Sequence, residues 1–155
     1  NAKISVKEEV RAFAGFEQQT VTSSCSEQSS SLYGSFRISL RDVSTKNLSF
    51  DISPSEMKYE IESTLDVGKV LVTREDNFVG GISSFTWKII LLEKLGNVAL
   101  FGGEGSLVCS DGNPGQLMIS EIESGTMPKL GGIYSGSMDI LVTDSGEEEF
   151  DQIVE

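Results

Sequence analysis

The sequence predicts a mainly β fold: an antiparallel β-sandwich with one short helix, followed by a partial second β unit. Short segments alternate between apolar and polar residues, with turn signals between them, and this pattern favours a sandwich. Only one segment has helical spacing, and no glycine-rich phosphate loop follows a strand, which disfavours a βαβ nucleotide fold. The partial second unit is predicted by an internal echo of the sequence.

The N-terminal third is expected to hold three strands. Residues 3–10 resemble an opening strand, and residues 47–52 a short return strand. Between them, residues 34–41 alternate cleanly, so that one face of the strand is apolar. That face consists of Phe36, Ile38 and Leu40. The serine-rich residues 20–31 are instead predicted to be an exposed loop or an edge, which suits O-linked sugar.

A helix is predicted near residues 54–65. Ser53 is a suitable N-cap, Pro54 fits the first helical position, and Glu56 completes a capping box. The apolar residues that follow recur at helical spacing, so one stripe is expected to pack on the sheet. This stripe consists of Met57, Ile61 and Leu65.

The remaining strands of the first unit follow the helix. Val70 and Val72 mark a strand that is expected to end at Arg74, with a turn over 76–81. Residues 85–92 form the strongest strand pattern, with Trp87 expected at the centre of the core. Further apolar segments are predicted to close the unit before a dense turn. These segments cover 98–101 and 104–109, and the turn covers 111–115.

The echo relates two segments about a hundred residues apart. Residues 33–42 are echoed by 135–144, and Phe-Asp follows both, at Phe50 and Phe150. The second copy stops where Ser53 would begin the helix. We therefore expect a complete unit at 1–115 and a partial copy at 116–155, whose open sheet edge needs a partner.

An ordered series of motifs resembles the tandem β-sandwich repeat of large secreted surface proteins from algae and related protists. The resemblance covers roughly residues 34–100 and recurs in 116–144. It implies an extracellular Ig-like building block used in series, with no enzymatic activity to transfer. The matching segments are Gly34-Ser35-Phe36, then Val67-Gly68-Lys69-Val70-Leu71-Val72-Thr73-Arg74, then Gly80-Gly81 with Phe85-Thr86-Trp87, and Leu95-Gly96-Asn97.

Composition excludes several classes of function. With 24 acidic and 12 basic residues the net charge is −12, which argues against nucleic acid and anionic membranes as partners. Histidine is absent, so Ser-His-Asp and Cys-His nucleophile systems and most zinc sites are excluded. No apolar run is long enough to span a membrane, and we expect no signal peptide. We expect no enzyme, no cofactor, no metal and no membrane insertion.

Two cysteines, Cys25 and Cys109, lie in no metal-binding spacing. In an extracellular protein an even count predicts a disulfide, and the alternative is two unrelated buried thiols. Such a bridge would stabilise the fold by about 4 kcal/mol in the chain-entropy model.

Other candidate sites have competing interpretations. Asn47-Leu48-Ser49 is the one Asn-x-Ser/Thr sequon, and in a secreted protein Asn47 would carry a glycan. The acidic run 147–151, with Asp139 or Asp144, is a weak calcium candidate that is better explained as a solvated turn. The aromatic residues on alternating strand positions are expected in the core rather than on a carbohydrate platform. They are Phe36, Phe85 and Trp87.

The leading functional hypothesis is a structural protomer of an extracellular or cell-surface fibre or layer. Copies of the chain would join head-to-tail by β-strand complementation, because the second unit lacks the strands that cover its apolar face. A head-to-tail contact does not close, so it propagates into a filament. The candidate assembly residues are Ile4 and Val6 in the donor strand, and Met138, Ile140 and Val142 in the acceptor.

The alternative is a glycan- or protein-binding module from a longer extracellular tandem-repeat protein. In that case the strands that the second copy lacks lie further along the longer protein, and its sheet is not open. Filaments of the purified protein would favour the first hypothesis, and glycan binding by the monomer would favour the second.

Overall fold

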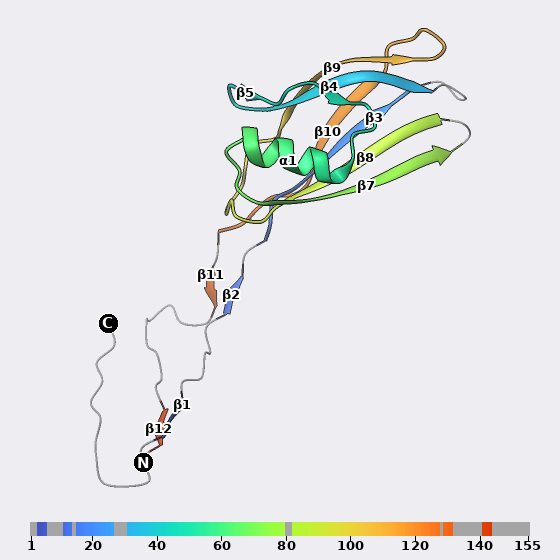
Figure 1. The fold of residues 1–155 in the computed structure, drawn as a ribbon. Coiled ribbons are helices and arrows are strands. Elements are labelled where there is room, and N and C mark those ends of the chain that lie inside the picture. The colour runs from blue at the N-terminus through green and yellow to red at the C-terminus, as the bar shows by residue number, and fades with distance from the viewer. Residues whose placement is uncertain are drawn as a thin grey trace. The chain divides into compact units, whose positions relative to one another are not determined.

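The computed structural model shows a chain built of β-strands and one helix (Figure 1). It divides into two compact units, one formed by residues 14–127 and the other by residues 1–13 together with 128–155. The residues that the structure describes are 3–5, 11–13, 15–26, 31–79, 82–127, 129–131 and 141–143.

The unit formed by the two ends of the chain contains two antiparallel strand pairs. β1 pairs with β12, which places Ile4 opposite Val142, and β2 pairs with β11, which places Ala12 opposite Leu130. The segment before the large unit therefore pairs with the segment after it. The strands are β1 (Lys3–Ser5), β2 (Arg11–Phe13), β11 (Lys129–Gly131) and β12 (Leu141–Thr143).

The large unit contains two antiparallel sheets, so the predicted β-sandwich with one short helix is confirmed. The first sheet has the order β10-β3-β8-β7, in which β3 and β8 are central and β10 and β7 are the outer strands. Its members are β3 (Gln18–Ser24), β7 (Val70–Val79), β8 (Ile82–Leu91) and β10 (Gln116–Glu123).

The second sheet is centred on β4, as its alternating sequence predicts. β9 pairs along one side of β4, and the short strands β5 and β6 pair along the other. The members are β4 (Leu32–Leu40), β5 (Val43–Ser44), β6 (Leu48–Ser49) and β9 (Gly102–Cys109). Phe36 and Ile38 point inward from β4 and are buried, which confirms the predicted face of this strand.

The core lies between the two sheets. Trp87 from β8 is fully buried and packs against Phe36 from β4, with ring centroids 5.4 Å apart. The indole N–H donates to the carbonyl of Ile52 at 2.9 Å, so its one polar atom is satisfied. The prediction that Trp87 is central is confirmed.

Helix α1 (Pro54–Thr64) begins and ends as predicted. Ser53 accepts from the backbone N–H of Glu56, and the Glu56 carboxylate accepts from the backbone N–H of Ser53, which completes the capping box. The apolar stripe is buried, and the helix packs against β7. That stripe consists of Met57, Ile61 and Leu65.

The prediction of an exposed loop or edge over residues 20–31 is wrong for residues 20–24, whereas residues 26 and 31 are exposed and lie outside the strands. Gln18–Ser24 is a central strand, because its alternate residues face the core although two of the three are polar. Ser23 donates to the carbonyl of Phe50 at 3.2 Å. Gln19 donates to Ala99 O at 3.2 Å and accepts from the N–H of Phe101 at 2.9 Å. Buried polar groups with such partners cost little.

One strand boundary also differs from expectation. β7 continues to Val79 instead of turning from residue 76, because it pairs with β8 along its whole length. β10, which begins at the expected unit boundary of 115/116, is the fourth strand of the first sheet and pairs with β3. The repeat relationship of 116–155 to the first unit stays a prediction.

Candidate functional site

The described part of the chain contains no cluster of three metal-ligating side chains. Within the same residues, no helix has the length and apolar character needed to cross a membrane. The acidic run 147–151, with Asp139 and Asp144, lies outside the described residues. Asp111 and Asn113 form a turn, as predicted, in which the Asn113 N–H donates to Asp111 Oδ1 at 2.9 Å.

The two cysteines are brought together. Cys25 and Cys109 form a disulfide with an S–S distance of 2.10 Å, and both residues are buried. Cys25 follows the end of β3 and Cys109 ends β9, so the bond joins the two sheets. The predicted disulfide is confirmed.

The predicted aromatic residues lie in the core, as expected. Phe36, Phe85 and Trp87 are all buried between the sheets, so none of them lines an open surface. A carbohydrate platform on these three residues is thereby excluded. The exposed aromatic side chains of the large unit are different residues, among them Tyr33 and Tyr59.

The predicted glycan acceptor lies on the surface. Asn47 is exposed, whereas the next residue, Leu48, is almost completely buried and fixes the position of the sequon. Asn47 lines two depressions, one beside α1 and a smaller polar one of about 150 Å³ beside Arg37 and Glu104. The side chain is therefore accessible to a modifying enzyme, and its glycosylation stays a prediction.

The predicted assembly strands are partly described. β1 and β12 bring Ile4 opposite Val142 in an antiparallel pair, although the two residues lie near opposite ends of the chain. Val6, Met138 and Ile140 lie outside the described residues.

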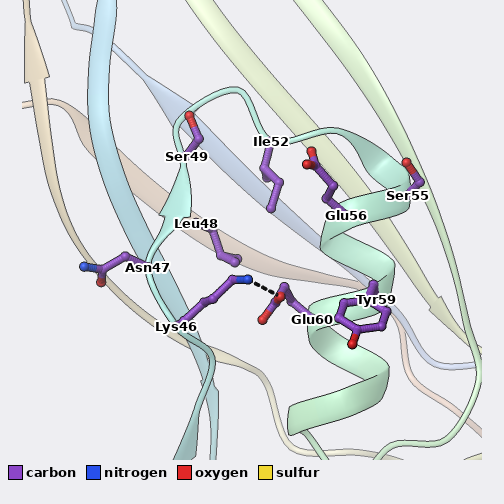
Figure 2. A pocket seen from close by; sticks show the side chains of 9 residues that line it. All are labelled: Lys46, Asn47, Leu48, Ser49, Ile52, Ser55, Glu56, Tyr59 and Glu60. Carbon is purple, nitrogen blue, oxygen red and sulfur yellow. Dashed lines mark ion pairs between the residues drawn. The ribbon is translucent and has the colours of Figure 1, made fainter.

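The surface of the large unit has a groove of about 520 Å³ between β6 and α1, which we call the β6–α1 groove (Figure 2). Its floor is apolar, because Leu48 and Ile52 are buried beneath it. Its walls come from the loop before β6 and from the helix. The wall residues used below are Lys46, Glu56, Tyr59 and Glu60.

One ion pair spans this groove. Lys46 reaches from the loop to Glu60 on the helix, with 2.6 Å between Nζ and Oε1 (Figure 2). The Lys46 side chain is 71% exposed and that of Glu60 only 10%. The hydrogen bond to Glu60 and the attraction of its charge raise the pKa of Lys46, so the lysine stays protonated.

The loop that carries Lys46 is fixed by its neighbour Thr45. The buried hydroxyl of Thr45 accepts from the N–H of Ile38 at 3.1 Å and donates to the carbonyl of Lys46 at 2.9 Å. The N–H of Thr45 also donates to Ile38 O at 2.9 Å. These bonds attach the wall of the groove to β4, so its shape is preformed.

Sequence reasoning missed this groove because its walls are separated in the chain. The one local signal is the spacing of Glu56 and Glu60, which places both on one side of the helix. Nothing in the sequence relates Lys46 to Glu60, since the approach of β6 to α1 depends on the packing of Leu48 and Ile52.

A second buried carboxylate, Glu17, was also missed. Glu17 accepts from the N–H of Gly125 at 2.7 Å, from the N–H of Val98 at 3.3 Å and from the amide of Gln19 at 3.0 Å. Burial alone would raise the pKa of Glu17, but these hydrogen bonds outweigh it, and the pKa is lowered. This carboxylate joins the start of β3 to the segment after β10, which is a structural role.

Comparison with protein-family models finds no match to this chain, and comparison with curated proteins finds none either. The function is therefore inferred from the geometry of the described residues.

Proposed function

We propose that this chain is a structural protomer of an extracellular fibre or surface layer, in which neighbouring copies join head-to-tail by β-strand complementation. The observation that carries the proposal is the ladder between β1 and β12, in which the sequence-predicted donor residue Ile4 is opposite the acceptor residue Val142. In one chain this ladder joins two distant segments. The same ladder formed between copies would join two molecules.

Exchange of β1 between copies keeps every pair of the ladder. Lys3 would face Thr143, and Ser5 would face Leu141, as they do within one chain. Because the contacts are identical, exchange costs little, and mass action favours it at high concentration. Each copy gives one strand and receives one, and when these are exchanged with two different neighbours the contact propagates into a filament.

The large unit offers a second surface that suits assembly. Of the two outer strands in its first sheet, β7 has three consecutive charged residues, Arg74, Glu75 and Asp76, which discourage strand addition. β10 is uncharged from Gln116 to Ser120, and its Met118 is 61% exposed. The β10 edge is therefore the one suited to lateral contact between filaments.

Extracellular location and covalent glycans belong to the same proposal. The disulfide supports an oxidising compartment, because such bonds are rare where thiols are kept reduced. An accessible Asn47 supports N-glycosylation. The high negative charge keeps separate copies soluble until strands exchange.

The proposal is tested by electron microscopy and by crosslinking between separately purified variants, Ile4→Cys and Val142→Cys. After mixing at high concentration and oxidation, we expect filaments and an intermolecular disulfide, because the two positions face each other in the ladder. Lys3→Cys mixed with Val142→Cys is the matched control, since it is one residue out of register. Uniformly monomeric particles, or equal crosslinking in both mixtures, would contradict strand exchange.

A glycan-binding module is the second candidate function, and one observation favours it. The β6–α1 groove combines an apolar floor, an exposed tyrosine and an ordered ion pair on the large unit (Figure 2). This groove is independent of β1 and β12, so binding there and assembly are compatible.

A further inference from the structure

We infer that the β6–α1 groove is a binding site for a neutral saccharide, which packs on Tyr59 and hydrogen-bonds to Lys46 and Glu60. The inference goes beyond strand exchange and does not depend on it, because all three residues belong to the large unit.

The first argument is the exposure of Tyr59. Its side chain is 68% exposed although it lies on the groove and large aromatic side chains are usually covered. Beside it, the apolar floor of Leu48 and Ile52 is a surface that water solvates poorly. A sugar ring has C–H faces that pack on such apolar and aromatic surfaces while its hydroxyl groups remain available for hydrogen bonds.

The second argument is the pairing of Lys46 with Glu60. The pair holds a donor and an acceptor side by side at 2.6 Å, on a wall of the groove. The Lys46 ammonium group has three N–H donors and directs one of them to Glu60 Oε1. The other carboxylate oxygen of Glu60, Oε2, has no hydrogen-bond partner among the described residues. Every buried side-chain oxygen in that part of the chain has a hydrogen-bond partner. Because Oε2 has none, it is not buried, and solvent reaches it. Adjacent sugar hydroxyls, which both donate and accept, match this arrangement.

The third argument is charge, which decides the class of ligand. Glu60 is neutralised by Lys46, and Glu56 accepts from the hydroxyl of Ser53 at 2.7 Å in the capping box. Both carboxylates therefore already have partners within the chain, and no three metal-ligating side chains cluster in the described residues, which argues against a metal ion as the ligand. With two carboxylates against one ammonium, the groove also repels phosphate and other anions. A neutral, polyhydroxylated ligand is the class that remains.

The saccharide has two possible sources with the same chemistry. It is either a free or partner-borne glycan, or the glycan on Asn47, which lines the same groove. In Figure 2 the Asn47 side chain points away from the helix, which favours a sugar from outside the chain. The site binds a pyranose ring in both cases, and the experiment separates the two sources.

The full chain is prepared by secretion into a bacterial periplasm, where the disulfide forms and no N-glycan is added. Backbone amide signals are followed by NMR during titration with methyl α-glucoside, methyl α-mannoside and N-acetylglucosamine. We expect saturable shifts for Lys46, Tyr59 and Glu60 with at least one sugar, at a millimolar Kd. Inorganic phosphate and tetramethylammonium are titrated as decoys.

Two variants in the groove and one control variant outside it show whether the sugar binds in the groove. Tyr59→Ala is expected to weaken binding about tenfold without loss of fold, because this side chain is exposed. Tyr33→Ala removes another exposed tyrosine, one that does not line the groove, and is expected to leave binding unchanged. Glu60→Gln keeps the shape but removes the acceptor charge, and we expect weaker binding with an unchanged NMR fold signature.

Protein from a host that adds N-glycans separates the two sources. If the Asn47 glycan occupies the groove, Tyr59 signals are already shifted and free sugar no longer binds. If the sugar comes from outside, free sugar binds both preparations equally, and both results support the site.

The inference is overturned if no sugar shifts these signals in either preparation, if a decoy binds instead, or if Tyr33→Ala and Tyr59→Ala lose binding equally. Filament formation is scored separately, so each failure is distinguishable.

Discussion

Strand β3 is anchored at its C-terminal end by the Cys25–Cys109 disulfide and at its N-terminal end by the buried carboxylate of Glu17. The disulfide joins β3 to β9 and therefore joins the two sheets. Glu17 instead gathers the N–H groups of Gly125 and Val98, which come from two loops. One end is held by a covalent bond and the other by hydrogen bonds to a single ionised group.

The two anchors act on different states of the protein. A disulfide across 84 residues acts mainly by restricting the unfolded chain, and its contribution does not depend on side-chain ionisation. Glu17 acts in the folded state, where its carboxylate accepts from the buried N–H groups of Gly125 and Val98. The first anchor should therefore respond to reduction alone, and the second to substitution and to pH.

The largest expected effect is loss of the disulfide. The double variant Cys25→Ser, Cys109→Ser should lose about 4 kcal/mol of unfolding free energy. Urea unfolding at neutral pH measures this loss, and reduction of the wild type is the control that should reproduce it. A loss below about 1 kcal/mol would show that the covalent anchor is dispensable.

The next effect is removal of the Glu17 carboxylate. Glu17→Ala leaves the buried N–H groups of Gly125 and Val98 without acceptors, and we expect a loss of about 3 kcal/mol. Glu123→Ala is the matched control, because Glu123 accepts from Gln18 at an exposed site of the same strand pair. That control should lose less than about 1 kcal/mol. Equal losses in the two variants, measured by urea unfolding, would contradict the anchoring role.

The smallest effect is the dependence on pH. The pKa of Glu17 is lower in the folded chain than its ordinary value of 4.5, so the folded protein holds this proton less tightly. The stability from Glu17 is fully present above pH 4.5 and is lost as the pH falls through the lower folded value.

This contribution is isolated by Glu17→Gln. The wild type should be more stable than the variant by about 2 kcal/mol at pH 7, and the gap should narrow below about pH 4.5. Chemical unfolding of both proteins over this range measures the gap. A gap that is constant with pH would show that folding leaves the pKa of Glu17 unchanged, which would contradict the role of its ionised form. The disulfide variant, by contrast, should stay below the wild type by the same amount throughout.

The two anchors also differ in how well the sequence alone predicts them. Cysteine pairs are recognisable because few residues make that bond, so Cys25 and Cys109 stood out in the sequence. Glu17 is one of 24 acidic residues, and no local pattern separates it from the solvated ones. Its role depends on Gly125, whose backbone approaches that of Gly96 so closely that a side chain would clash.

The same reason accounts for the error over β3 and for the missed groove. A polar residue such as Ser23 is read as part of a loop because the partner of its hydroxyl group, Phe50, lies elsewhere in the chain. Lys46 and Glu60 meet only after β6 and α1 have packed on the core. In contrast, the strand around Phe36 was predicted correctly because its neighbours in sequence already show the alternation.

Local sequence patterns are enough to predict the β class, the capped helix α1, the inward face of β4 and the pair of cysteines. Each of these depends on residues a few positions apart or on side-chain chemistry that has one common use. The packing of the folded chain is needed to establish that β3 is central, that Ile4 faces Val142, that Glu17 is an anchor and that a groove separates β6 from α1. These features depend on which distant segments meet, and that is settled by burial of the shared core and by satisfaction of buried polar groups.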